Sequence, residues 1–235
     1  MLTTTYTFAM DDTLISCLEQ RLGDLLRAKR VEALTEEREP EIARISSALA
    51  GGVLMQGPCV VLMTGMPGAG KTTLALALAR AGFKRLCPDE EMFRRYGRYG
   101  VDFPRGEFRV REAPVLNDIA AELRALVEAG EDVVVDHGFW TPEERAEWQA
   151  LVMESGGIPV LVYLPVPHDV RWSRIRERNQ LADIDPNSIE FSEEDLIRFA
   201  GRFHEPDTDE THIVYDGQPD TLLTALGWPR ETGDR

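Results

Sequence analysis

The hydrophobic and polar positions of this chain alternate between strand-like and helix-like patterns, and together these patterns predict an α/β fold. Short apolar runs typical of buried strands are separated by segments with the period of an amphipathic helix. The expected strands are 60–64, 83–86, 133–136, 158–164 and 212–215. The expected helices are 71–79, 113–129, 142–154, 171–179, 192–203 and 220–226. Because strands that alternate with helices pair in parallel, the pattern predicts a five-stranded parallel sheet in a three-layer sandwich.

The first 57 residues precede this pattern and predict a helical extension. Leu14, Leu18 and Leu22 recur at helical spacing among charged residues, and a second helix is expected at 41–50. The first interpretation is an extension packed on the core, and the alternative is a regulatory or dimerising arm. The main domain is expected at 58–217, followed by a C-terminal tail at 218–235.

A glycine-rich turn joins the first expected strand to the first expected helix. It reads Gly65-Met66-Pro67-Gly68-Ala69-Gly70-Lys71-Thr72-Thr73, which matches the phosphate-loop pattern G-x-x-x-x-G-K-[ST]. Glycines let successive backbone N–H groups point at an anion, and the helix start adds its own unpaired N–H groups. Lys71 is expected to contact the β- and γ-phosphates, and Thr72 is expected to ligate Mg²⁺.

The turn therefore predicts a nucleoside triphosphate site with ATP and Mg²⁺ as cofactors. The cofactor-binding candidates all belong to the loop and the first helical turn. They are Gly65, Pro67, Gly68, Ala69, Gly70, Lys71, Thr72 and Thr73.

Acidic residues follow the second and third expected strands. Asp89 comes after the strand at 83–86, and Asp136 with His137 ends the strand at 133–136. Ligands of open parallel sheets bind outside the carboxyl ends of the strands, so these side chains lie at the catalytic edge. Asp89 is the first choice for the general base, with a helix cap as its structural alternative. Asp136 is expected to ligate Mg²⁺ or to orient the acceptor, and His137 is a third candidate base.

Between positions 94 and 111 arginines alternate with aromatic residues in an otherwise acidic chain. A guanidinium beside an aromatic ring can hold a phosphate, a carboxylate or a nucleobase. Arg105 and Arg109 are therefore candidate acceptor-binding residues. The alternative is a solvated segment whose arginines pair with surplus acidic residues.

A second arginine-rich stretch at 171–179 places its arginines three and four residues apart, on one helical face. This spacing suits a lid near 171–190 that closes over a triphosphate, with Arg174 and Arg178 neutralising charge during transfer. An exposed Arg/Glu helix is the alternative.

Length and charge narrow the range of partners. The chain has 235 residues and a formal net charge of −15, which disfavours a broad surface for nucleic acid or another polyanion. No apolar run is long enough to span a membrane, and the N-terminus lacks the pattern of a signal peptide. These features predict a cytoplasmic protein without a membrane partner.

The order of these motifs resembles the small bacterial P-loop kinases, which include chloramphenicol phosphotransferase, zeta toxins and the kinase domain of polynucleotide kinase. The resemblance spans about 60–215 and rests on the phosphate loop, Pro88-Asp89-Glu90, the strand ending in Asp136, the lid arginines and the run 203–210. It implies that Asp89 is the base and that Arg174 and Arg178 belong to the lid. Polynucleotide kinases carry an arginine three residues after this aspartate, where the chain has Met92.

Together these observations predict an ATP-dependent phosphotransferase that moves the γ-phosphoryl group to a hydroxyl of a small-molecule acceptor of the antibiotic, nucleoside or sugar type. Three alternatives stay open: a polynucleotide 5′-hydroxyl kinase, a zeta-toxin-like sugar-nucleotide kinase and a non-enzymatic nucleotide-binding switch. Residues Asp89, Arg105, Arg109, Asp136 and His137 form the expected acceptor side. The oligomeric state stays open, with a dimer through the N-terminal helices as one arrangement.

Overall fold

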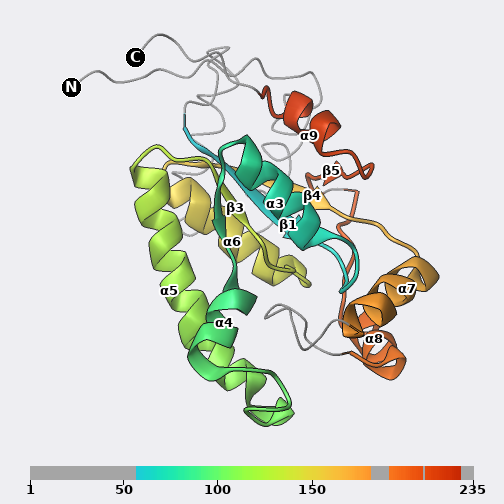
Figure 1. Ribbon diagram of the computed structural model, residues 1–235. Coiled ribbons are helices and arrows are strands. Elements are labelled where there is room, and N and C mark those ends of the chain that lie inside the picture. The colour runs from blue at the N-terminus through green and yellow to red at the C-terminus, as the bar shows by residue number, and fades with distance from the viewer. Residues whose placement is uncertain (1–56, 181–190, 209, 229–235) are drawn as a thin grey trace, which may run out of the picture.

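A five-stranded parallel sheet forms the centre of the computed structural model, which describes residues 57–180, 191–208 and 210–228 (Figure 1). The strand order is β2-β3-β1-β4-β5. The strands are β1 (Cys59–Thr64), β2 (Lys84–Leu86), β3 (Val133–Val135), β4 (Ile158–Tyr163) and β5 (Ile213–Val214). All four pairings between neighbouring strands are parallel, so the predicted fold class is confirmed.

Helices cover both faces of this sheet (Figure 1). They are α3 (Lys71–Ala81), α4 (Pro88–Tyr96), α5 (Phe108–Glu128), α6 (Pro142–Glu154), α7 (His168–Asn179), α8 (Glu193–Ala200) and α9 (Pro219–Ala225), with the 3₁₀ helix η2 (Arg105–Glu107) before α5. The predicted N-terminal helices and positions 181–190 of the predicted lid lie outside the described residues. Across the described ranges, no helix combines the length and the apolar composition needed to cross a membrane.

Strand β1 is the middle of the hydrophobic core, and every one of its side chains is buried. Val60 and Leu62 pack in one cluster with side chains of α5 and α6, whereas Val61 and Met63 pack in a second cluster with α3 and α9. A strand covered on both faces is apolar at successive positions, which explains the uninterrupted apolar run in the sequence.

Helix α5 begins at Phe108 rather than at Ala113, so its predicted start is wrong. The prediction placed Pro114 in the first helical turn, where proline is favoured. In the structure Pro114 lies inside the helix, where it cannot donate a backbone hydrogen bond. The helix continues through it because buried side chains such as Val115 and Ile119 hold this face against the sheet.

The segment assigned to the C-terminal tail contributes to the core as far as it is described. Leu222 and Leu226 are buried in the cluster that contains α3. The ring of Trp228 lies 4.9 Å from that of Phe83, measured between centroids. Helix α9 therefore covers α3 on its side of the sheet.

A buried ion pair fixes the segment that leads into β5. Thr141 caps α6 through a capping box. One turn further, the fully buried Arg145 donates hydrogen bonds of 2.6 Å to each carboxylate oxygen of Glu210 and one of 2.9 Å to the carbonyl of His204. A buried guanidinium needs such partners because an unpaired charge in the interior is costly. The run 203–210 thus joins α6 to the end of the sheet.

Candidate active site

The strand pairing brings three segments to one edge of the sheet. Leu62 of β1 and Leu86 of β2 both pair with Val135 of β3, so the residues that follow these strands meet. The amide of Asp136 donates to the carbonyl of Leu86 at 2.7 Å. The phosphate loop, the start of α4 and Asp136 are therefore neighbours, as the sequence predicted from the carboxyl ends of parallel strands.

The phosphate loop has the backbone that an anion site requires. Gly68 and Gly70 adopt φ angles of 81° and 101°, which only glycine takes without strain. A Cβ on Gly68 would lie 2.8 Å from the backbone oxygen of Arg171, so the loop is also in close contact with α7. Gly70 is the N-cap of α3 and has no side chain to occupy the first N–H groups of the helix. These groups can point at a phosphate.

Lys71 lies between the loop and two carboxylates. Its ammonium group donates to the carbonyls of Gly65 at 2.8 Å and Met66 at 3.2 Å. Burial lowers the pKa of Lys71 to about 8, and the charges of Asp136 and Asp89 oppose this effect. The lysine is thus a desolvated cation whose charge an anionic ligand would favour.

Thr72 and Asp136 present adjacent oxygen atoms. The Thr72 hydroxyl donates to Oδ1 of Asp136 at 3.3 Å, and Arg85 donates to Oδ2 through Nε at 3.0 Å and Nη2 at 2.6 Å. Arg85 also binds Glu90 at 2.7 Å. The sequence analysis missed Arg85, because a strand of only three residues gives no indication of which neighbour its side chain faces.

The oxygen donors of Thr72 and Asp136 fit Mg²⁺, which prefers oxygen ligands and usually keeps water and phosphate oxygens as the rest of its shell. The described ranges hold no group of three or more His, Cys, Asp or Glu side chains arranged for a metal. A site built from one hydroxyl and one carboxylate needs a nucleotide to complete it. The predicted pair can therefore serve a nucleotide-bound ion.

Asp89 lies in the first turn of α4, next to the lysine. The predicted alternative role as a cap is wrong, because the helix starts at Pro88 and its N-cap is Cys87. Burial and, to a smaller extent, the charge of Asp136 raise the pKa of Asp89 to about 6 against the opposing charge of Lys71. A carboxyl group with this pKa can exchange protons near neutral pH.

Two glutamates that the sequence analysis did not single out, Glu112 and Glu144, also act electrostatically in this region. The pKa of Glu112 is raised to about 7, first by burial and then by the negative charges of Asp89 and Glu144. Glu144 accepts the amides of Trp140 at 2.9 Å and Thr141 at 3.2 Å. Both glutamates lie on helices rich in acidic residues, so their spacing in the sequence gave no signal.

His137 is close to the same carboxylates. Burial lowers its pKa to about 4, although the charge of Glu144 favours the protonated form. The imidazole is therefore neutral at neutral pH and a weak base.

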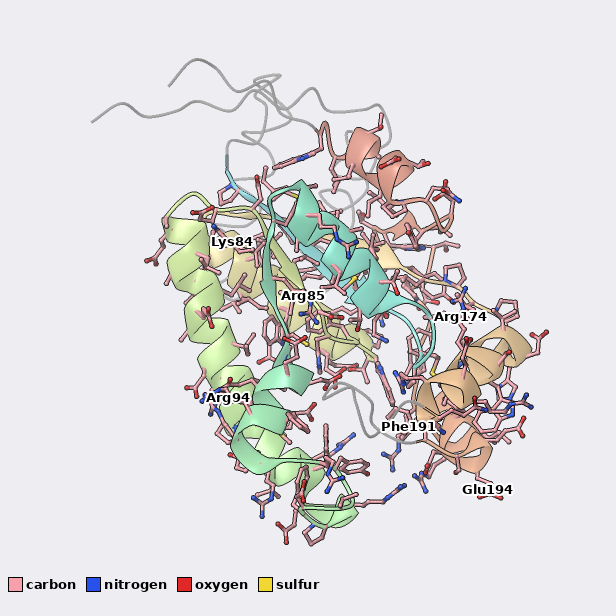
Figure 2. The ribbon with its side chains drawn as sticks, in the orientation of Figure 1. Lys84, Arg85, Arg94, Arg174, Phe191 and Glu194 are labelled. Carbon is pink, nitrogen blue, oxygen red and sulfur yellow. The ribbon has the colours of Figure 1, made fainter. Side chains whose placement is uncertain are left out.

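The predicted lid arginines approach the site from α7. Arg174 donates from Nη1 to the carbonyls of Gly68 at 3.2 Å and Ala69 at 3.4 Å, and Figure 2 shows it beside the loop. The charge of Arg178 acts on Lys71 and on Asp89, and its guanidinium lies 5.8 Å from the ring centroid of Phe191. Both side chains are thus on the nucleotide side of the site.

The arginine-rich segment 94–111 forms the end of α4, η2 and the start of α5. Its arginines pair with acidic partners to a large extent: Arg95 with Glu91 and Asp118, Arg98 with Asp102, and Arg111 with Glu107. Arg111 also lies over Tyr96 and Phe103, at 5.0 and 5.2 Å.

Arg105 and Arg109 differ in their surroundings. Arg105 lies 5.4 Å from the ring centroid of Tyr99 and pairs with Asp195 of α8 at 3.3 Å. Arg109 is exposed, and its charge lowers the pKa of Glu112. The charge of Arg109 therefore acts on Glu112, which is near Asp89, whereas Arg105 links η2 to α8 through its ion pair with Asp195. Acceptor binding by either arginine stays a prediction.

The fold and the phosphate loop are those of the P-loop class of α/β proteins. The AAA domain family (AAA_33) matches residues 60–206, more than half of the chain, and the chain belongs to this family. The expected relationship to the P-loop kinases is thereby confirmed. Among curated proteins, none matches this chain.

Two solved structures have a similar fold. One, from Chloroflexus aurantiacus, carries a provisional kinase assignment; it is 20% identical, with coverage of 72% of this chain and 96% of that chain and a TM-score of 0.58. The other is described as a sugar kinase from Janibacter sp. HTCC2649; it is 19% identical, with coverage of 76% and 99% and a TM-score of 0.51. At these identities the similarity concerns the fold alone.

Proposed function

We propose that the chain is an ATP-dependent phosphotransferase that moves the γ-phosphoryl group to a hydroxyl of a small-molecule acceptor. The observation that carries this proposal is the position of Asp89. Its carboxyl group has a pKa raised to about 6 and lies within electrostatic reach of Lys71 and Asp136, at the edge of the sheet where the phosphate loop ends. A base in this place can take the proton of a hydroxyl that attacks the phosphoryl group.

The other site residues bind the phosphates, neutralise charge and would hold the metal ion. Lys71 and the loop amides hold the β- and γ-phosphates, and Arg174 and Arg178 neutralise charge as it moves between donor and acceptor. Thr72 and Asp136 would hold Mg²⁺, which supplies further charge neutralisation on the phosphates when bound.

Asp89 is preferred as the base over its two neighbours for separate reasons. Asp136 already accepts two hydrogen bonds from Arg85 and one from Thr72, so its carboxylate has a positioning role. His137 has a pKa lowered to about 4, which makes it a weak proton acceptor at neutral pH. When the hydroxyl attacks, the new O–P bond forms, the bond to ADP breaks and Asp89 receives the proton.

The acceptor side favours a compact molecule of low negative charge. Glu112 lies within electrostatic reach of Asp89, and a wall that carries two carboxylates accepts hydrogen bonds from hydroxyl or amino groups. The position at which polynucleotide kinases carry an arginine is Met92, which is buried in the core. Antibiotics, nucleosides and sugars fit this wall better than a nucleic acid strand.

The test is a transfer assay with labelled ATP against nucleosides, aminoglycosides, sugars and oligonucleotides. We expect transfer to a small hydroxyl compound, and we expect Asp89→Asn to lower kcat by about two to four orders of magnitude. Asp118→Asn, on the exposed surface of α5, is the matched control and should keep wild-type turnover.

Three outcomes would contradict the proposal. Full activity of Asp89→Asn would remove the base from this residue. Preferred labelling of oligonucleotide 5′ ends would favour the polynucleotide alternative. Tight ATP binding without transfer to any acceptor would favour a nucleotide-binding switch.

A further inference from the structure

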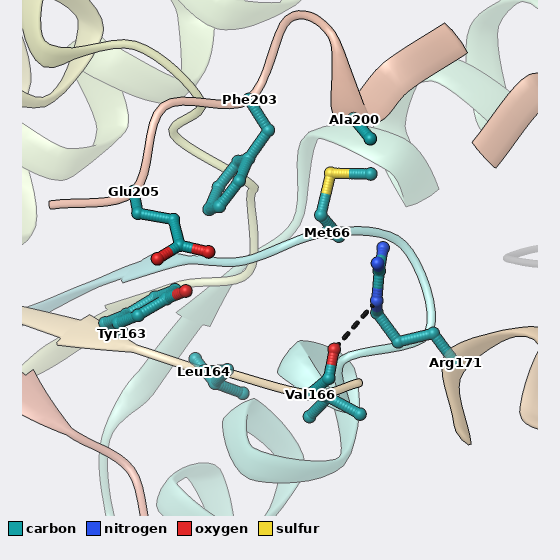
Figure 3. Close-up of a pocket in the computed structure, with 8 residues that line it drawn as sticks. All are labelled: Met66, Tyr163, Leu164, Val166, Arg171, Ala200, Phe203 and Glu205. Atoms are coloured by element: carbon teal, nitrogen blue, oxygen red, sulfur yellow. Dashed lines mark hydrogen bonds between the residues drawn. The ribbon is translucent and has the colours of Figure 1, made fainter. Parts of the chain in front are cut away.

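A pocket of about 160 Å³ lies beside the phosphate loop, at the carboxyl end of β4. Figure 3 shows its walls, which come from the loop, the residues after β4, α7 and the segment that follows α8. Its lining combines the apolar side chains Met66, Leu164, Val166 and Phe203 with the polar side chains Tyr163, Arg171 and Glu205. In the sheet order β4 lies on one side of β1, whereas β2 and β3, which precede Asp89 and Asp136 in the chain, lie on the other. The pocket is therefore distinct from the proposed acceptor site.

Arg171 is the unusual residue of this pocket. Only 9% of it is exposed, and its Nε donates to the carbonyl of Val166 at 2.9 Å. Its Nη1 is buried and has no hydrogen-bond partner among the described residues. Among the residues that the structure describes, no carboxylate forms an ion pair with it. Burial lowers the pKa of Arg171, as expected for a cation without a paired anion.

A buried guanidinium nitrogen without a partner calls for an explanation, because native proteins pair nearly all buried polar groups. The cost is larger for a charged group than for a neutral one. Arg171 lines the pocket, so an anionic ligand there would neutralise the charge of the guanidinium group.

The opposite side of the pocket is negatively charged. Figure 3 shows Glu205 and Tyr163 together, away from the guanidinium of Arg171. The pKa of the Tyr163 phenol is raised to about 12, first by burial and then by its hydrogen bond to Glu205. Tyr163 therefore stays protonated and donates to Glu205, which leaves Arg171 without a neutralising partner.

We propose that this pocket binds a small organic monocarboxylate, whose carboxylate accepts hydrogen bonds from Arg171 and whose apolar body packs against Met66, Leu164 and Phe203. A guanidinium favours a carboxylate over a neutral group. The volume is close to that of a cavity of roughly 150 Å³ that holds benzene. A second negative charge on the ligand would meet Glu205, so dicarboxylates and phosphate fit less well.

Benzoate is a suitable probe because it combines one carboxylate with a ring of the right size. Its binding to the full chain is measured by isothermal titration calorimetry, beside benzamide as the neutral counterpart and terephthalate as the dianion. We expect benzoate to bind at least about tenfold more tightly than benzamide, because the charged hydrogen bond to Arg171 is lost in the amide. Terephthalate should bind more weakly than benzoate, and Glu205→Gln should reduce this difference.

Variants at the pocket provide the structural control. Ala200→Phe adds a ring at the pocket wall and should weaken benzoate binding at least about tenfold, whereas Ile197→Phe on the exposed side of α8 should leave it unchanged. Arg171→Met should remove the preference for benzoate over benzamide. Melting temperatures of all variants show whether each one folds.

The proposal is overturned if benzoate does not bind the wild-type chain, if benzamide binds equally well, or if Ala200→Phe binds benzoate like the wild type. None of these results depends on phosphoryl transfer. ATP binding, measured on the same samples, tests the proposed function separately.

Discussion

At the scale of single residues, the site depends on charges held away from water. Lys71 and Asp89 have pKa values shifted toward neutrality, the lysine downward to about 8 and the aspartate upward to about 6. Burial is the largest cause in both cases, and the mutual attraction of the two groups reduces both shifts. Such opposed shifts in one site are typical of proton transfer chemistry and cost stability in the resting protein.

The pKa of Asp89 gives a prediction for the pH dependence of activity. The base must be ionised, so kcat/KM should fall as the pH decreases through about 6, by tenfold per pH unit below it. Rates measured from pH 5 to 8 with the acceptor found in the screen check this. The acid limb should disappear from the residual activity of Asp89→Asn. An unchanged limb in that variant would assign it to another group.

The same group gives a prediction for stability. The pKa of Asp89 is higher in the folded chain, about 6, than its ordinary value of 3.8, so the folded state binds the proton more tightly. The free energy of unfolding therefore decreases as the pH rises from about 4 to about 6, and the loss persists above it. Asp89→Asn should be more stable than the wild type at pH 7.5, and equally stable near pH 4. Urea unfolding at both pH values measures this, and a less stable variant at pH 7.5 would contradict it.

Lys71 leads to a prediction about nucleotide binding. A bound triphosphate favours the charged lysine and raises its pKa from about 8, so ATP binding at pH 8 should take up protons. Calorimetry in buffers of different ionisation enthalpy measures this uptake. Lys71→Ala should lose it and should also abolish phosphoryl transfer, because the loop offers no other side-chain charge for the β- and γ-phosphates. Near wild-type turnover of this variant would contradict the assignment of the site.

At the scale of secondary structure elements, the arginine-rich segment packs through ion pairs, and its role on the acceptor side is a prediction. Arg105 connects η2 to Asp195 of α8, whereas Arg109 lies near Glu112. Substituting either residue with alanine should raise the acceptor KM and leave the ATP KM nearly unchanged. Arg98→Ala, which removes a local pair with Asp102, is the control. Steady-state kinetics with both substrates varied distinguish these effects, and an increase confined to the ATP KM would place the two arginines on the nucleotide side.

The connection between α6 and the strand β5 gives a prediction for folding stability. Glu210→Ala leaves Arg145 buried without its carboxylate and should cost about 3–5 kcal/mol in the free energy of unfolding. Adding Arg145→Leu should recover most of this loss, because the uncompensated charge is then absent. Glu193→Ala, which breaks an exposed pair with His168, should change stability by less than about 0.5 kcal/mol. Guanidinium unfolding curves measure all three, and equal losses for the single and the double variant would contradict the argument.

At the scale of the whole molecule, acidity and the arrangement of the sheet act together. The net charge of −15 repels polyanions, while the phosphate loop, Lys71 and the α7 arginines attract a compact anion locally. Oligonucleotides should therefore neither compete with the acceptor nor accept phosphate at physiological salt. Labelling assays at several salt concentrations test this, and efficient 5′ labelling that falls steeply with salt would overturn it.

The sequence by itself determined the class of fold and the position of the phosphate loop between the first strand and the first helix of the sheet domain. The periodic spacing of apolar residues reveals strands and helices, because the buried positions recur regularly along each element. The phosphate loop is recognisable because its glycines, Lys71 and Thr72 lie in one short stretch of sequence. The position of Asp89 and Asp136 after two strands was enough to expect them at one edge. The predicted ends of helices were less accurate. Helix α5 starts before Pro114 because the packing of its buried face outweighs the local preference of this one residue.

The tertiary structure alone decided which side chains from distant segments face one another. Arg85 holds Asp136, the charge of Asp89 acts on Glu112, and Nη1 of Arg171 is buried without a hydrogen-bond partner among the described residues. No sequence pattern reveals these contacts, because each forms where separate helices and strands meet in the folded chain. Shifts in pKa follow the same rule, since they depend on the burial and charges that only the folded chain creates.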